Sequence, residues 1–343
     1  MDKVFETSKV IPKVKLSNTE TDNIKPNFIR KGKQDISLTV KNVPWLESIN
    51  KVNKAIGNSR IFGKQDDEVM FCISIDGSVD SEYAYQMITE DYFVSNVKLL
   101  CVYIFNSKSD SSYNYNNKKL TIVDKYSSKL KSFQNKAHLI VEDRGNNSHY
   151  LEQTILFAEN YLSNFIVIGY NGIKGALGDN KELHIGLSYL LSYCKTPILI
   201  IKEKNTREKK ENKAMRFLII LDKNYSNSHR VFNWFLPIIN CEIDTVDFLE
   251  FYPEMGTKDD RDWKELIHSV AEKNALESFN YDKVSYSKAG FGKSVIKLVN
   301  FGKTHYNYLL FYNILSKHKL DIENSESMDM VISCQTNIGF VNN

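Results

Sequence analysis

The sequence lacks the features that mark membrane and secreted proteins. No apolar run approaches the roughly 20 residues needed to cross a bilayer, and the opening MDKVFETSKV has neither an apolar signal core nor an Arg-rich transit pattern. The five cysteines are scattered, and no C-x-x-C pair occurs, which argues against both a zinc ribbon and a disulfide framework. We therefore expect a cytoplasmic protein in a reducing compartment, with no membrane contact.

Motifs of hydrolases and metalloenzymes are also missing. There is no H-E-x-x-H, no G-x-S-x-G follows a strand, and the seven histidines show no metal-ligand spacing. The net charge of +3 is far from the strongly basic character of nucleic-acid-binding proteins. We expect no catalytic centre, no metal site and no nucleic-acid partner, although a weak ATPase activity stays open.

The chain is long enough for two hydrophobic cores, because 42% of its 343 residues are hydrophobic. Its positive charge is concentrated in residues 1–64, which hold 13 Lys or Arg against 6 Asp or Glu; this net charge of +7 leaves −4 on the rest. Three prolines, at positions 12, 26 and 44, interrupt any long element there. We expect a largely irregular N-terminal arm over 1–64, which docks on the protein's own core or on a protein partner.

From residue 69 onward, apolar strands alternate with helical segments. This alternation predicts a parallel sheet covered by helices on both faces. The polar stretch 106–119, with SYNYNNKK at 112–119, is interpreted as a solvated loop rather than an RNA-binding segment. A charged run from 202 to 213 has almost nothing to bury, so we place a first domain at 65–203 and a linker at 204–214. The predicted strands are 69–75, 97–105, 138–143, 164–170 and 197–202, and the predicted helices are 80–93, 120–134, 149–161 and 182–194.

The same pattern then repeats. FLIILDKNYSNSHRVFNWFLPII, from 217, lies over FCISIDGSVDSEYAYQMITEDYF, from 71, at a constant offset of 146, which matches Asp76 to Asp222. The fold class predicted is therefore α/β, with two doubly wound, mostly parallel five-stranded sheets in tandem and a second domain at 215–343. Its further strands are predicted at 244–252, 283–288, 306–314 and 336–341, and its helices at 263–276 and 294–302.

Two segments of the first domain suggest a ligand site. Asp76 ends the first strand, where its carboxylate could accept from a nucleobase amino group or a ribose hydroxyl; alternatively, beside Ser78, it caps the next helix. GYNGIKG follows the fourth strand, and its glycines at 169, 172 and 175 would let backbone N–H groups approach a phosphate. Both segments belong to one edge of the predicted sheet.

These segments resemble the universal stress protein family. The resemblance rests on ISIDGS (73–78), LLCVYIF (99–105), FIVIGYNGIKG (165–175) and CKTPILII (194–201). It implies a tandem of two such domains with dimer-like pairing through the last strand, and binding of ATP or a related adenine nucleotide with Mg²⁺. The sequence leaves open whether the repeats pair within one chain or between chains, and the exposed edge strands favour pairing within one chain. It also implies the nucleotide-binding residues. Ile75 and Asp76 would face the adenine and ribose, and Val102 would line the base pocket. Gly169 and Gly172 would approach the phosphates.

The sequence departs from the family pattern in both repeats. ATP-binding members carry a second small pair, Gly then Ser or Thr, where this chain has Glu182 to Ile185, and Gly186 is followed by a leucine. His184 could replace that phosphate contact or be a surface residue. In the second repeat, Tyr312 and Leu315 stand where the glycines at 169 and 172 stand in the first. We expect the second repeat to be a structural pseudo-domain.

A rival motif, SKAGFGKS at 287–294, differs from a phosphate-binding loop only at its first residue. Three hypotheses result. The first is a non-catalytic, universal-stress-protein-like regulatory protein with at most one degenerate nucleotide site. The second is an assembly or scaffold protein of a large, for example cytoskeletal, complex anchored by its arm. The third is a phosphate-loop NTPase.

Overall fold

The computed structural model describes residues 68–92, 97–106, 113–143, 149–174, 180–203, 213–221, 225–253, 263–286, 290–313 and 326–342. The predicted N-terminal arm, most of the predicted linker and three residues named above, Gly175, Asp222 and Leu315, lie outside these ranges. Within them, no helix is long and apolar enough to span a membrane. The description that follows concerns these residues alone.

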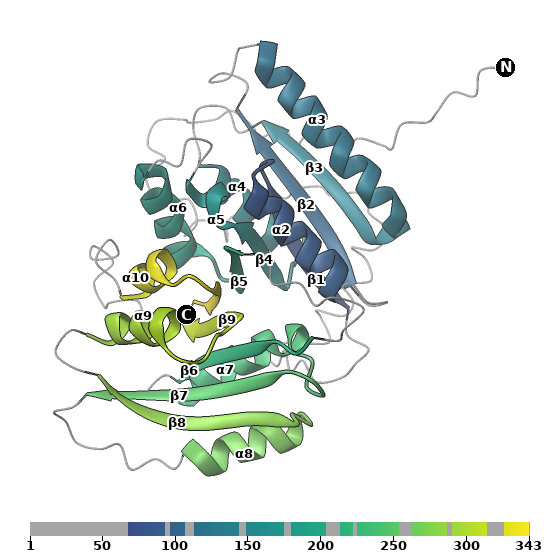
Figure 1. The fold of residues 1–343 in the computed structure, drawn as a ribbon. Helices are drawn as coiled ribbons and strands as arrows, with labels where there is room; N and C mark the ends of the chain where they lie inside the picture. The colour runs from purple at the N-terminus through teal and green to yellow at the C-terminus, as the bar shows by residue number, and fades with distance from the viewer. Residues whose placement is uncertain are drawn as a thin grey trace. The chain divides into compact units, whose positions relative to one another are not determined.

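The described strands form one sheet in the order β3-β2-β1-β4-β5-β10-β9-β6-β7-β8 (Figure 1). Every neighbouring pair is parallel except β5 and β10, which are antiparallel. Each half is a doubly wound, five-stranded unit, so the α/β fold class is confirmed. We use "first repeat" for β1 to β5 and "second repeat" for β6 to β10. The strands are β1 Val69–Ile75, β2 Val97–Phe105, β3 Ala137–Asp143, β4 Phe165–Gly169, β5 Ile198–Ile201, β6 Arg216–Leu221, β7 Thr245–Pro253, β8 Ser278–Tyr286, β9 Tyr308–Tyr312 and β10 Asn337–Val341.

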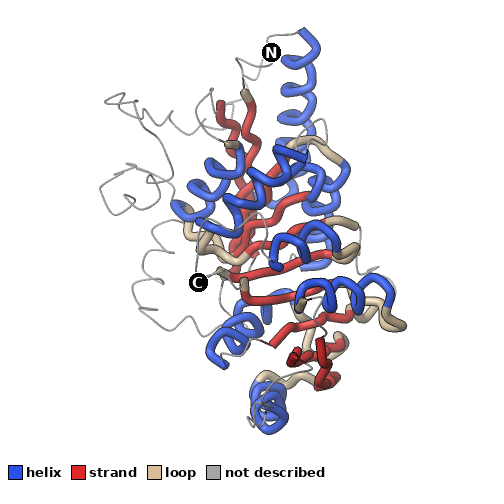
Figure 2. Tube along the Cα trace, turned by 90° about the vertical axis from the view of Figure 1, so that its left-hand side faces the viewer, coloured by secondary structure: helices blue, strands red, loops and turns tan. Residues whose placement is uncertain are grey.

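Helices cover both faces of the sheet, as Figure 2 shows. Buried side chains of α2, α3, α7 and α8 join one hydrophobic cluster on one face, while α4 packs on the opposite face against β1, β2 and β4. The central strands β1, β4, β5, β9 and β10 are buried along their whole length and are mainly apolar, as the sequence indicated, whereas the edge strand β8 is polar and partly exposed. The helices are α2 Val79–Met87, α3 Tyr113–Leu130, α4 Tyr150–Asn160, α5 Tyr170–Lys174, α6 Asn180–Tyr193, α7 Tyr225–Phe235, α8 Trp263–Lys273, α9 Phe291–Phe301 and α10 Glu326–Ser333, with short helical turns at Ile88–Tyr92, Lys131–Lys136 and Leu236–Ile238.

The internal repeat extends to individual contacts. In the first repeat, Asn164 precedes β4, and its Oδ1 accepts from the Met70 N–H of β1 at 2.8 Å. In the second repeat, Asn307 precedes β9, and its Oδ1 accepts from the Arg216 N–H of β6 at 2.8 Å. Each repeat also has a pair of stacked rings on these two strands. The ring centroids are 5.1 Å apart in Phe71–Phe165 of the first repeat and in Phe217–Tyr308 of the second. The two repeats therefore share a structure as well as a sequence pattern.

The repeats meet at the centre of the sheet, where β5 and β10 pair through Ile200–Ile338, Leu199–Gly339 and Ile198–Phe340. A Cβ on Gly339 would lie 2.6 Å from Leu310 and 2.8 Å from Phe235, so a larger residue there would force these two side chains to move. The ring of Phe165 in β4 is 5.9 Å from that of Phe235 in α7. The hydrophobic core is consequently continuous across the two repeats.

Two buried asparagines of the second repeat bind the end of a first-repeat helix. Asn342 Nδ2 donates to the carbonyl oxygens of Leu190 at 2.7 Å and Cys194 at 2.6 Å, near the C-terminus of α6. Asn313 Nδ2 donates to Asn342 Oδ1 at 2.7 Å and to the Leu191 carbonyl at 2.9 Å. These bonds satisfy carbonyl groups that a helix end leaves unpaired. They give the junction between repeats a specific polar component.

The structure differs from the predicted secondary structure at four places. Residues 113–119, predicted as a loop, are the first turns of α3, because no Gly or Pro separates them from its buried turns at Ile122, Tyr126 and Leu130. Residues 170–174 of the predicted glycine-rich turn 169–175 form the short helix α5. No element was predicted at α10, whose residues Met328 and Val331 are fully buried. β8 also begins earlier than the predicted 283, because nine of its residues pair with β7.

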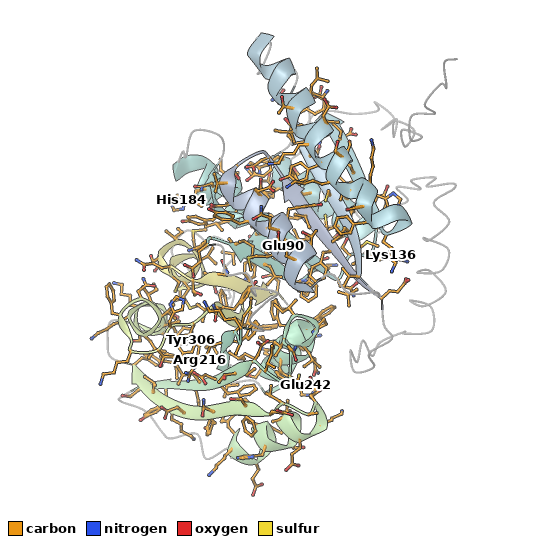
Figure 3. The ribbon with its side chains drawn as sticks, turned by 45° about the vertical axis from the view of Figure 1, so that its right-hand side comes forward. Glu90, Lys136, His184, Arg216, Glu242 and Tyr306 are labelled. Carbon is orange, nitrogen blue, oxygen red and sulfur yellow. The ribbon has the colours of Figure 1, made fainter. Side chains whose placement is uncertain are left out.

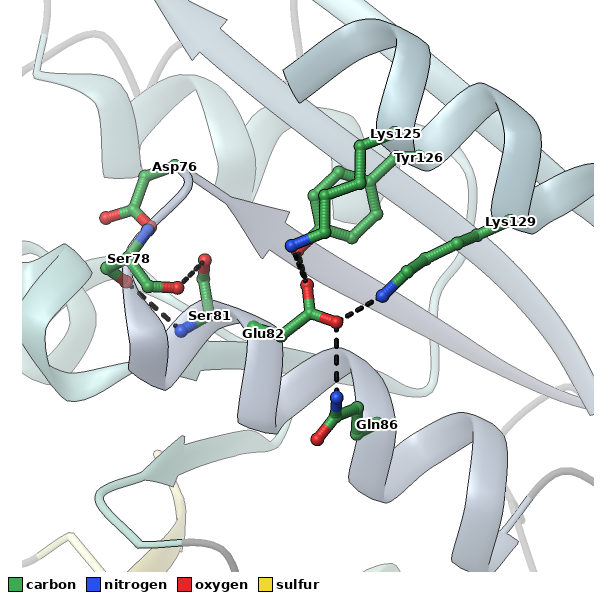
Figure 4. Close-up of polar contacts among 8 residues, drawn as sticks. All are labelled: Asp76, Ser78, Ser81, Glu82, Gln86, Lys125, Tyr126 and Lys129. Atoms are coloured by element: carbon green, nitrogen blue, oxygen red, sulfur yellow. Dashed lines mark hydrogen bonds and ion pairs between the residues drawn. The ribbon is translucent and has the colours of Figure 1, made fainter. Parts of the chain in front are cut away.

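A network of charges joins α2 to α3 (Figure 4). Glu82 of α2 accepts from Lys125 Nζ at 2.8 Å, from the Tyr126 hydroxyl at 2.8 Å and from Lys129 Nζ. Burial alone would raise the pKa of Glu82, but the hydrogen bonds from Lys125, Lys129 and Tyr126 outweigh it and lower the pKa from 4.5 to about 2. The ionised carboxylate therefore stabilises the folded state.

We expect Glu82→Gln to lower the free energy of unfolding at pH 7 by about 1 to 2 kcal/mol, which is less than the whole pKa shift implies, because both lysines are partly in solvent. Since the folded pKa lies below the unfolded one, this stabilisation is complete above pH 4.5 and is lost as the pH falls toward 2. Urea unfolding of the wild type and of Glu82→Gln across this pH range shows whether their free energies of unfolding converge at low pH. Glu68→Gln, which removes an exposed partner of Lys98, should cost less; a pH-independent difference for Glu82→Gln would contradict the prediction.

Candidate functional site

The candidate site lies at the carboxyl ends of β1 and β4 in the first repeat. The chain leaves β1 toward β2 on one side, and it leaves β4 toward β5 on the other side. This divergence is the switch point at which open α/β sheets bind ligands. Asp76 directly follows β1, and Gly172 lies in α5, directly after β4. The structure therefore brings the two sequence segments together at the position where a ligand is expected.

The two carboxylate oxygens of Asp76 face different parts of the structure, one the turn before α2 and the other the candidate site. Oδ1 accepts from the Ser78 N–H at 2.8 Å, while Gly77, with φ of 80°, makes the sharp turn before α2. The helix cap itself is Ser78, whose hydroxyl oxygen accepts from the Ser81 N–H at 3.1 Å (Figure 4). Oδ2 of Asp76 faces Gly172, where a Cβ would come within 2.7 Å. No donor of the described residues reaches Oδ2, so this oxygen can accept from a ligand.

The other glycines of interest have packing roles. A Cβ on Gly169 would lie 2.4 Å from the Ser81 nitrogen and 2.5 Å from the Asp80 carbonyl carbon, so α2 packs directly on the end of β4. A Cβ on Gly186 would lie 2.9 Å from Leu151, which shows that α6 packs closely on α4 there. His184 is exposed on α6 (Figure 3). Contact of Gly169 or His184 with phosphate stays a prediction.

The side chains of Ile75 and Val102 point to different faces of the sheet. In the β1–β2 register Ile75 pairs with Tyr103, whereas Val102 pairs with Ser74. Because neighbouring residues of a strand point to opposite faces, the two side chains lie on opposite sides of the sheet. Both are fully buried, with 1% and 0% of their surface exposed. The family resemblance supplied both positions, and the alternation along each strand argues against a shared role for the two side chains.

Two further residues that the sequence analysis missed hold α5 in place. Asp80 Oδ2 accepts from the Asn171 N–H at 3.0 Å, and the Tyr150 hydroxyl donates to the Gly172 carbonyl. Asp80 lies in the first turn of α2, and Tyr150 begins α4. Both elements start at the carboxyl edge of the sheet, so the position of Tyr150 just after the third strand and its loop is the sequence signal that could have found it.

The phosphate-loop candidate is occupied by a side chain of the protein. Gly290, with φ of 101°, precedes α9, and the Gly292 N–H donates to Glu326 Oε1 at 3.3 Å. The Ser294 hydroxyl donates to the Gly290 carbonyl at 3.1 Å. In a phosphate loop these two groups would face phosphate and Mg²⁺. The contacts of the described part, 290–294, therefore argue against the NTPase hypothesis; 287–289 lie outside the described ranges.

The second repeat differs from the first at the equivalent edge. Tyr312 ends β9, is 7% exposed and belongs to the hydrophobic core. Its ring occupies the core at the strand end that carries Gly169 in the first repeat. Near the opposite ends of these strands, Arg216 lies over the ring of Tyr306 at 5.8 Å (Figure 3). Among the residues that the structure describes, no group of three His, Cys, Asp or Glu side chains could hold a metal ion.

Comparisons with known proteins identify the fold. No protein-family model and no curated protein matches the sequence. A universal stress protein from Archaeoglobus fulgidus DSM 4304 is similar in structure, with a TM-score of 0.54 and 14% identity over 81% of this chain and 97% of that one. The cytoplasmic domain of a prokaryotic cation chloride cotransporter gives a TM-score of 0.45, with 8% identity over 80% and 96%. An Arabidopsis thaliana family member with AMP bound gives 0.27, with 10% identity over 42% and 96%. The chain thus has the fold of the Archaeoglobus fulgidus universal stress protein.

Proposed function

We propose that this chain is a non-catalytic regulatory protein whose first repeat binds an adenine nucleotide of the ATP type between β1 and β4. The observation that carries the proposal is the placement of Asp76 Oδ2 beside Gly172 at the switch point of the sheet. A carboxylate oxygen suits a ribose hydroxyl or a base amino group, and the missing side chain at 172 lets this carboxylate lie directly against α5. The fold supports the proposal, because it has a ligand edge of this kind.

The described residues fit the nucleoside better than the outer phosphates. Gly186, the nearest candidate for a phosphate-binding small residue, is buried against Leu151 and Ile173. The second repeat, with Tyr312 at the equivalent edge, completes the sheet and the core. We therefore assign at most one degenerate nucleotide site to the chain, in the first repeat, with Mg²⁺ held by the nucleotide phosphates.

The alternative is an assembly protein in the cytoplasm that uses its basic arm to join a larger complex. It is favoured by the packing roles of Gly169 and Gly186, which explain these glycines without any ligand. The contact of Asp76 Oδ1 with the turn likewise has a purely structural explanation. The two functions differ in whether Asp76 Oδ2 has a ligand.

Asp76→Asn separates the two explanations. Asparagine keeps an oxygen that accepts from the Ser78 N–H, but it removes the charge that a ligand would meet. We expect calorimetric titration of ATP with Mg²⁺ into the full chain to show binding about tenfold weaker or more in Asp76→Asn, since hydrogen bonds to charged groups contribute about 1.5–3 kcal/mol. Its urea midpoint should stay close to that of the wild type.

The matched control is Asp282→Asn, an exposed acid on β8, which should bind ATP as the wild type does. Asp76→Ala should lose both binding and some stability, because it also removes the acceptor of the turn. If the wild type binds no ATP with or without Mg²⁺, or if Asp76→Asn binds equally well, the nucleotide proposal is wrong and the assembly function remains.

A further inference from the structure

The short helix α5 is held from both repeats. Within the first repeat it is bound by Asp80 and Tyr150, as described above. Its first residue, Tyr170, also donates its hydroxyl to the Ile332 carbonyl at 3.3 Å. Ile332 belongs to α10 of the second repeat, 162 positions further along the chain. One side chain of α5 is therefore bonded to a helix of the other repeat.

Lys202, just after β5, strengthens this contact. Its Nζ donates to the carbonyl oxygens of Val331, of Ile332 at 3.4 Å and of Cys334 at 2.5 Å, and it lies 4.4 Å from the centre of the Tyr170 ring. The carbonyls at a helix C-terminus are unpaired and carry the negative end of the helix dipole, so a lysine binds them favourably. We call Tyr170 and Lys202 the α10 clamp.

We propose that the α10 clamp makes the second repeat a regulator of the ligand site in the first; this inference rests on the proposed nucleotide site. Tyr170 separates Gly169, which is fixed against α2, from Gly172, which lies beside Asp76 Oδ2. A shift of α10 therefore turns α5 about a fixed end and moves Gly172 relative to Asp76. Conversely, a ligand that holds α5 holds α10, because coupling between two sites is reciprocal.

The clamp residues are thus positioning residues rather than ligand contacts. If they served only the overall stability of the fold, their loss would affect α10 and the urea midpoint but not the affinity for ATP. If they position α5, their loss changes affinity, and ATP changes the exchange of α10 amides with solvent. Amide hydrogen exchange reports such local opening directly.

The test combines hydrogen exchange and ATP titration on the full chain, in the wild type, Tyr170→Phe and Lys202→Met. We expect both variants to bind ATP about fivefold more weakly or worse, within the usual range of coupling between sites. In the wild type, ATP should slow exchange at 326–333. Matched controls are Tyr126→Phe, which loses its hydroxyl bond to Glu82, and Lys98→Met, which loses its pair with Glu68; both should bind ATP as the wild type does.

Two outcomes overturn the inference. In the first, the wild type binds ATP, but α10 exchange is unaffected by ATP and the clamp variants bind normally; the proposed function then stands without regulation by the second repeat. In the second, the wild type binds no ATP, and amide exchange at 171–174 is the same in ligand-free Lys202→Met as in the wild type. The first result overturns the proposed function, and the second overturns the link between α10 and α5. Faster exchange at 171–174 in ligand-free Lys202→Met supports the link between α10 and α5 in either case.

Discussion

Replacing Gly169 by alanine should lower the free energy of unfolding by about 3 kcal/mol, at the upper end of typical overpacking effects. The new methyl group would lie 2.4 Å from the Ser81 nitrogen and 2.5 Å from the Asp80 carbonyl carbon, which are backbone atoms that no rotamer change can move. Relief requires α2 to shift away from β4. Urea unfolding followed by circular dichroism measures the loss.

The matched control is Gly172→Ala, which makes the same change three positions later. Its methyl group would meet Asp76 Oδ2 at 2.7 Å, the end of a side chain that can rotate, so we expect a stability loss below about 1 kcal/mol. Its effect should instead appear in ATP binding, because Asp76 must turn aside. Equal stability losses in the two variants would show that α2 does not pack on Gly169 as closely as described.

Asn342→Ala should destabilise the junction between the repeats by about 3 to 4 kcal/mol. The change leaves the carbonyls of Leu190 and Cys194 and one donor of Asn313 without their partner, in a region closed to water. Each buried polar group left unpaired costs about 1–3 kcal/mol. Asn342→Asp keeps the shape but turns an oxygen toward two carbonyl oxygens, so it should cost at least as much and recover in part at low pH, where a protonated carboxyl can donate.

Asn300→Ala is the comparison for this experiment. Asn300 Nδ2 donates to the Ser333 carbonyl at 2.8 Å and its Oδ1 accepts from the Gln335 N–H at 2.9 Å, but both bonds are exposed and water can replace them. We expect its loss to cost less than about 1 kcal/mol. A similar urea midpoint for Asn300→Ala and Asn342→Ala would mean that the junction does not depend on the buried asparagines.

The fold was predictable because its strands carry two strong signals. The mainly apolar runs 69–75 and 97–105 became β1 and β2 with the predicted bounds, since a strand covered on both faces has few polar positions. The offset that matches Phe71 to Phe217 predicted the second repeat. α10 was missed because its four buried residues in a single short helix give no long periodic pattern. α3 was shortened because its first turns are polar, and burial further along the helix decides their structure.

The candidate site was predictable only in part. Strand ends mark the edge of a parallel sheet, so Asp76 and Gly172 could be placed together from the sequence. Whether a glycine there faces a ligand or a helix depends on packing distances, and Gly169 turned out to lie against α2. Tyr170 and Lys202 could not be recognised, because their partners are backbone carbonyls 129 to 162 positions away, and a carbonyl has no sequence signature.

The place of β10 in the sheet has a consequence for synthesis. This strand follows all others in the sequence, yet it lies in the middle of the sheet, between β5 and β9. Until the ribosome has made it, the edges of β5 and β9 are unpaired, and both strands are apolar and otherwise buried along their whole length. Exposed apolar edges invite pairing with other chains. The nascent chain therefore needs protection at the centre of its sheet, not only at its rims, from the synthesis of β5 until that of β10.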